Sequence, residues 1–166
     1  MSRLFPFPAA RAFLVCAALT ACGHVDYRTD ADGHFSGDLF VMWVGEGGAS
    51  GDGAFVFVPN RSNPLTFTWT DAENNKQVVQ PEMMYTDGGS IPKFAQVFNG
   101  FGPWGYAPAY MIHDWLYMAR HCNVDGTPTE AEARVAAITF QESAEILNAS
   151  INALVASGRV KRNDVA

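Results

Sequence analysis

The chain has 166 residues, of which 17% are charged and 48% are hydrophobic, and its formal net charge at pH 7 is −6. This length fits one globular domain with an apolar core. The acidic balance argues against a basic face for nucleic acid, so no nucleic-acid partner is expected.

The first 21 residues are typical of a bacterial signal peptide. Arg3 and Arg11 supply a basic start, and residues 12–21 form an apolar run that is too short to cross a bilayer. The run ends in Leu19-Thr20-Ala21-Cys22, which resembles the lipobox of bacterial lipoproteins, where the cysteine is acylated and becomes the new N-terminus. We therefore expect residues 1–21 to be removed and Cys22 to be the lipidation site, so that the membrane is a partner through the lipid anchor.

The expected mature protein has nine basic and 17 acidic residues, a net charge of −8. Gly23 stands where an aspartate retains such lipoproteins in the inner membrane, so we expect a location at the outer membrane, facing the periplasm. Cys16 leaves with the signal peptide and Cys22 is acylated, so only Cys122 remains and no internal disulfide can form. A packed core must therefore supply the stability.

The expected mature chain divides into a tether, one domain and a tail. Residues 22–37 are mostly polar without apolar periodicity, which predicts a flexible tether between the lipid and the domain. The domain is expected over residues 38–160, and residues 161–166 are expected to form a disordered tail.

The first half of the domain has the patterns of β-strands. Strands are predicted at residues 39–44, 54–58 and 65–70. Glycine-rich residues 45–53 and polar residues 71–75 are typical of turns. A fourth, shorter strand is expected within residues 77–85, interrupted by Pro81. Together these patterns predict an antiparallel sheet in the form of a meander.

The second half has the patterns of helices. Residues 107–120 predict one helix, and residues 127–130 predict the start of another, with Thr127 as its cap and Glu130 closing a capping box. This helix is expected to continue to the region of Gly158, a suitable stop. Strands followed by helices predict an α+β fold, with the antiparallel sheet in the N-terminal half and two or more helices packed on it in the C-terminal half.

A glycine-containing loop is the first candidate for chemistry. Asp87 precedes Gly88, Gly89 and Ser90. Adjacent glycines let backbone N–H groups approach a ligand or adopt a positive φ. Asp87 could bind a metal ion there, or it could accept hydrogen bonds from the loop itself in an Asx-type turn.

A helical segment is the second candidate. His113, Asp114 and Tyr117 lie in the predicted helix, with Tyr117 four residues after His113 and three after Asp114. One of these side chains could face a water or a metal while its neighbour faces a supporting partner. The other interpretation is a buried histidine fixed by a carboxylate and a hydroxyl, with no catalytic role.

Both segments resemble the domain-of-unknown-function family 1353, small bacterial and phage-borne proteins. The similarity lies in a TDGASIPR-like loop at Thr86-Asp87-Gly88-Gly89-Ser90-Ile91-Pro92, and an HDxLY helix at His113-Asp114-Trp115-Leu116-Tyr117. Glu130-Ala131-Glu132 stands where the family has an EAD-type helix start, so Glu132 is either a metal ligand or an acid that the first turn of a helix favours. This chain has Gly89 for the usual alanine, Lys93 for the arginine and Glu132 for the aspartate. The resemblance implies a fold and a site, but no activity.

A shorter similarity connects the helix with the secreted phospholipase A2 group, whose catalytic helix also carries His-Asp followed by a tyrosine. Carried over, His113 would activate water, Asp114 would bind Ca2+, and Gly88-Gly89 or residues 102–105 would form the glycine-rich loop. The flanking cysteines of that group are absent from this chain.

Two functions remain open at this point. The first is a small envelope hydrolase of an ester, amide or phosphoester, with His113 as general base, Tyr117 stabilising charge, and Asp87, Asp114 and Glu132 as oxygen ligands of Ca2+, Mg2+ or Mn2+. The second is a non-catalytic envelope or prophage-derived binding module in which the His-Asp network is structural. The substrate or the envelope partner is not identified by the sequence.

Overall fold

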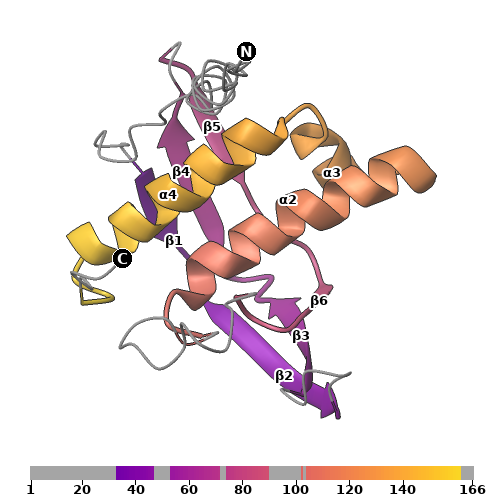
Figure 1. Cartoon of the computed structure of the whole chain (residues 1–166), viewed down its shortest axis with the longest axis horizontal. Helices are drawn as coiled ribbons and strands as arrows, with labels where there is room; N and C mark the ends of the chain where they lie inside the picture. Colours follow the sequence, from indigo (N-terminus) through magenta and orange to yellow (C-terminus); the bar gives the residue numbers. More distant parts are fainter. Residues whose placement is uncertain (1–32, 47–52, 72–73, 90–101, 103, 162–166) are drawn as a thin grey trace, which may run out of the picture.

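The computed structural model describes residues 33–46, 53–71, 74–89, 102 and 104–161. The strands are β1 (Gly33–Ser36), β2 (Leu39–Gly45), β3 (Ala54–Pro59), β4 (Thr66–Thr70), β5 (Lys76–Val79) and β6 (Met84–Thr86). The helices are α2 (Ala107–Asp125), α3 (Glu130–Val135) and α4 (Phe140–Ala156). Strands therefore fill the first half and helices the second, which confirms the predicted α+β fold (Figure 1).

The strands form two antiparallel sheets of three strands rather than the single meander that we expected. One sheet has the order β1-β4-β5 and the other has the order β2-β3-β6. Only the pairs β2–β3 and β4–β5 join consecutive strands, so each sheet also recruits a strand from a distant part of the chain. The meander prediction was wrong because strand periodicity carries no information about which strands pair.

The predicted fourth strand is two strands that belong to different sheets. β5 pairs with β4, whereas β6 pairs with β3. Pro81 lies between them and is buried. Because proline has no backbone N–H to donate, it ends the first strand and lets the chain cross to the second sheet.

The predicted tether is too long by at least four residues, because β1 belongs to the domain. Gly33 to Ser36 pair with β4, and the ring of Phe35 is 4% exposed. Phe35 packs on Phe67 with a centroid separation of 4.8 Å. Gly33 permits this packing, since a Cβ there would lie 2.7 Å from the Phe67 ring. A four-residue strand with one apolar residue gave no periodicity to detect.

Helices α2 and α4 cover the inner faces of the sheets. α4 packs on β1 and β4, α2 reaches β6, and the two helices contact each other along the molecule (Figure 1). The core between these layers contains the fully buried side chains Phe57, Phe67, Trp115, Ile146 and Leu154. None of the helices in the described residues is long and apolar enough to cross a membrane.

Two capping boxes divide the second predicted helix into α3 and α4. Thr129, not Thr127, caps α3, and Glu132, not Glu130, returns the hydrogen bond to the cap. Thr139 and Glu142 form the same arrangement at the start of α4, so the expected single helix is two. The Thr139-x-x-Glu142 signal was present in the sequence, but the continuous apolar pattern of residues 135–147 hid it.

The predicted stop at Gly158 is confirmed. Gly158 has a φ of +70°, and its N–H donates to Val155 while the N–H of Arg159 donates to Leu154. This is the hydrogen-bond pattern of a Schellman motif, which satisfies carbonyl groups in the last turn of α4.

The assignment of β1 to the core can be tested by stability. Phe35→Ala is expected to lower the free energy of unfolding by about 3–5 kcal/mol, because a buried phenyl ring is removed. His34→Ala changes the neighbouring exposed residue and is the matched control, with an expected effect within about 0.5 kcal/mol. Urea unfolding measures both. Equal, small effects would return residues 33–36 to the tether.

Candidate functional site

The centre of the candidate site is a hydrogen bond between the second sheet and α2. Thr86, at the end of β6, donates from Oγ1 to Oδ2 of Asp114 on α2 at 2.9 Å. Thr86 is two residues after Met84 in the strand, so both side chains point toward the helices. Asp114 lies one helical position after His113, near the middle of α2. The strand and the helix therefore fix this carboxylate from two sides.

The surroundings of Asp114 make its carboxyl group a weak acid. Its pKa is raised to about 6, mainly by burial and to a smaller extent by the negative charge of Asp87, while the hydrogen bond from Thr86 acts in the opposite direction. Burial acts in this way because it penalises the charged form. A carboxyl group with a pKa of about 6 exchanges its proton close to neutral pH.

The loop after β6 is shaped by two glycines. Gly88 has a φ of +82°, which favours glycine, and its N–H donates to Oγ1 of Thr86 at 3.0 Å. A Cβ on Gly89 would lie 2.6 Å from the ring of Tyr110, which is buried on α2. Gly89, which stands where the similar loops have alanine, therefore leaves the space that the Tyr110 ring occupies in this chain.

Asp87 is exposed beside this loop, and its charge reaches Asp114. The structure thus brings together two of the three residues that we predicted as metal ligands. Ser90, the last predicted residue of the loop, and Cys22, the predicted lipidation site, lie outside the described residues.

His113 and Tyr117 form a separate pair on α2. Their rings are 5.1 Å apart, and the ring of Tyr117 also meets Phe140 at 6.3 Å. Burial lowers the pKa of His113, so its imidazole is neutral at neutral pH. Within the described residues, no hydrogen bond joins His113 to Asp114. The two side chains are therefore separate groups and do not form the His-Asp network that the sequence suggested. Adjacent helix positions point about 100° apart, which separates them.

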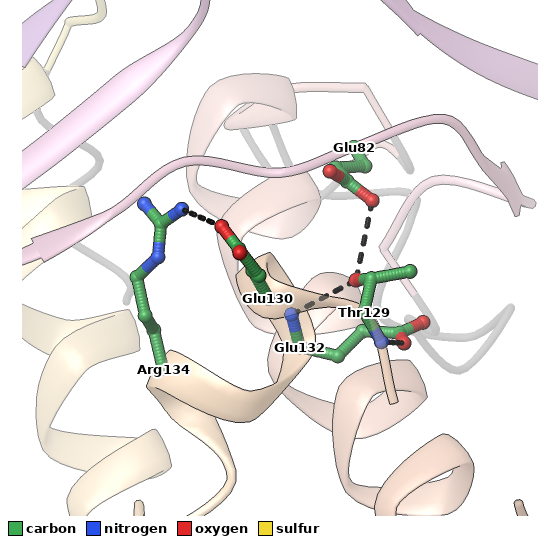
Figure 2. A network of polar contacts seen from close by, with 5 residues as sticks. All are labelled: Glu82, Thr129, Glu130, Glu132 and Arg134. Atoms are coloured by element: carbon green, nitrogen blue, oxygen red, sulfur yellow. Dashed lines mark hydrogen bonds and ion pairs between the residues drawn. The ribbon is translucent and has the colours of Figure 1, made fainter. Parts of the chain in front are cut away.

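The third predicted metal ligand, Glu132, is held elsewhere. Its Oε2 accepts from the backbone N–H of Thr129 at 2.6 Å, and its own N–H donates to the Thr129 hydroxyl at 3.2 Å. Figure 2 shows this capping box, with Glu82 accepting from the Thr129 hydroxyl at 3.4 Å. The bond from the Thr129 backbone is the largest influence on Glu132 and lowers its pKa, and a hydrogen bond with Cys122 acts in the same direction.

The predicted three-carboxylate metal site is therefore not assembled. In the part of the chain that the structure describes, no three His, Cys, Asp or Glu side chains lie close enough to share an ion. The carboxylate of Glu132 begins α3, where the first turn of a helix favours an acid. Of the three predicted metal ligands, only Asp87 and Asp114 therefore lie near each other.

Two residues that contribute to these arrangements were not assigned a role from the sequence. Thr86 positions Asp114, and the period of β6 could have shown that its side chain points inward with Met84. Cys122 forms a hydrogen bond with Glu132. No sequence signal predicts the contact between Cys122 and Glu132, because Cys122 lies on α2 and Glu132 lies on α3.

The raised pKa of Asp114 predicts a pH dependence of stability. Its pKa is about 6 in the folded protein against an ordinary value of 3.8, so its contribution to stability is largest below pH 3.8 and is lost as the pH rises to about 6. Asp114→Asn, which can still accept from Thr86, is expected to remove this decline, on the order of 2 kcal/mol. Urea unfolding of both proteins at pH 4 and pH 7 measures the difference. Parallel pH profiles would contradict the shift.

Comparison with protein families places these elements in a wider group. A family described as "Protein of unknown function (DUF1353)" matches residues 65–153, from the start of β4 into α4. The match contains Thr86, Asp87, His113 and Asp114. Comparison with curated proteins and with solved structures found no match. Since the family covers more than half of the sequence and includes the whole candidate site, the chain belongs to the DUF1353 family.

Proposed function

We propose that the chain is a small hydrolase of an ester, amide or phosphoester, in which Asp114 and His113 transfer protons. The raised pKa of Asp114 is the observation that carries the proposal, because a carboxyl group that exchanges its proton near neutral pH is suited to acid-base catalysis.

His113 supports the same reaction class from the neighbouring position. Because burial lowers its pKa, the imidazole is neutral and able to accept a proton from water. Asp114 in its protonated form would donate to the leaving group. Tyr117, whose ring lies beside His113, would orient the substrate or stabilise developing charge.

A metal-assisted form of the proposal uses fewer protein ligands than we first expected. Asp87 and Asp114 would offer carboxylate oxygens to Ca2+, Mg2+ or Mn2+, and Mg2+ sites with one or two carboxylates are common. When bound, the ion would lower the pKa of a coordinated water. Glu132 is not part of this form, because the capping box of α3 holds its carboxylate.

A second candidate function is a non-catalytic binding or structural module. The observation that favours it is the Thr86–Asp114 hydrogen bond, which ties β6 to α2. A partly buried hydrogen bond of this kind stabilises the contact between the sheet and the helix, and this role requires no catalysis. Asp114→Asn separates the two candidates, since the amide can keep the hydrogen bond but cannot transfer a proton in the same way.

The hydrolase is tested with chromogenic nitrophenyl esters and phosphoesters and an amide analogue, each with and without EDTA. If any is turned over, Asp114→Asn and His113→Ala are expected to lower the rate by about 10²–10⁴-fold. Val124→Ala changes an exposed residue on the same helix and serves as the control. Loss of turnover with EDTA, restored by Mg2+, Ca2+ or Mn2+, would favour the metal-assisted form.

Unchanged turnover in both site variants would refute the assignment of these residues. If no substrate of the three classes is turned over and His113→Ala markedly lowers the melting temperature, the module becomes the better account.

We further propose that the protein is anchored by a lipid on Cys22 at the outer membrane, facing the periplasm. The basic start, the short apolar run and the cysteine after Leu19-Thr20-Ala21 support this location. One acyl chain binds a membrane only marginally, so the several chains of a bacterial lipoprotein are needed for stable anchoring.

The anchor is tested by labelling with radioactive palmitate in bacterial cells. Cys22→Ser is expected to abolish the label and leave the precursor at its full size. Cys16→Ser alters a cysteine inside the expected signal peptide and is the matched control, with labelling retained. Label that persists in Cys22→Ser would disprove lipidation at this residue.

A further inference from the structure

The sheet β2-β3-β6 has one face that no described element covers. Its inner face carries Phe57 and Met84, which are buried toward the helices. Side chains alternate along strands, so the neighbouring positions point the other way. We call this outward set the apolar face; it consists of Phe40, Met42, Val56, Val58 and Tyr85.

The register makes the apolar face continuous. Phe40 lies opposite Val58, and Met42 lies opposite Val56, which in turn lies opposite Tyr85. Phe40 is 52% exposed, Met42 58% and Tyr85 78%. None of its five residues is charged. Scattered apolar residues are normal on a surface, but a contiguous patch of this kind marks an interaction site.

We propose that the apolar face packs against the same face of a second copy of the chain, across a two-fold axis. Large side chains bury about 150–250 Å2 each, so Phe40, Met42 and Tyr85, which are half or more exposed, offer roughly 100 Å2 or more each. Val56 and Val58 are smaller and only partly exposed, so they add less. Together the five residues would cover about 450 Å2 on each copy and about 900 Å2 in total, which is in the range of weak, transient interfaces. Two such sheets would stack as in a β-sandwich.

The chemistry of the face favours a second copy over a lipid surface. The apolar face lacks basic residues, and the chain as a whole is acidic, so anionic headgroups would not attract it. β2 is an edge strand with backbone groups on its outer side that water or protein can satisfy and hydrocarbon cannot. The uncharged face also lets two acidic copies meet without placing like charges in contact. This inference does not depend on the proposed hydrolase.

The test is the oligomeric state of the full chain, measured by native mass spectrometry of protein released from a mild detergent over a range of concentrations. The parent is expected to form dimers. Met42→Lys and, independently, Tyr85→Lys are expected to weaken dimerisation at least about tenfold, since each would bury a charge at the centre of the interface.

Val78→Lys is the matched control, because Val78 is 52% exposed on β5 in the other sheet. It is expected to leave dimers unchanged. Melting curves confirm that each variant is folded, and the second variant replaces the first if that one is not.

Three results would overturn the proposal. They are a monomeric parent at every concentration, dimers that both folded lysine variants leave intact, and quenching by brominated phosphatidylcholine in proteoliposomes of the emission that Phe40→Trp adds to the parent. Phe40 lies on the apolar face and is 52% exposed, so quenching at this position would place the face in lipid instead.

Discussion

The hydrogen bond from Thr86 to Asp114 is the constraint around which the candidate site is arranged. It connects the last strand of one sheet with helix α2, which also packs on α3 and α4, and the carboxyl group is largely buried there. The loop that follows must then turn at once, which Gly88 permits, and pass the ring of Tyr110, which Gly89 permits. The weak acidity of Asp114 comes mainly from its burial, with a smaller contribution from the negative charge of Asp87, and the hydrogen bond from Thr86 opposes both.

Local patterns predicted most of the fold. Short apolar runs located β2 and β3, alternation of apolar and hydroxyl residues located β4, and Gly158 located the end of α4, because each of these signals depends on neighbours in the sequence. Strand pairing depends on residues far apart, so the two sheets could not be separated. β1 was missed because Phe35 is its only large apolar residue and it pairs with a strand about 30 residues later.

The candidate site was predicted in part. The motifs located Asp87, His113 and Asp114, and the structure brings the two aspartates close to each other. Helix geometry alone predicts that the neighbours His113 and Asp114 point about 100° apart, but the sequence could not show that Thr86, on a distant strand, is the partner of Asp114. Glu132 was assigned to the ligand set because of its place in the family motif, but the structure bears out the other interpretation, an acid in the first turn of a helix, where it closes the capping box with Thr129.

The alternation of the two sheets along the chain has a consequence for how the protein matures. The hairpins β2–β3 and β4–β5 can each form early, but the first waits for β6 and the second must capture β1 across the intervening hairpin. Closing such long loops slows folding relative to local contacts. The core therefore cannot close until α2 and α4, which follow all six described strands in the chain, are available. Until then both hairpins expose apolar side chains and unpaired strand edges, so the partly made chain is the form of this protein most prone to aggregation.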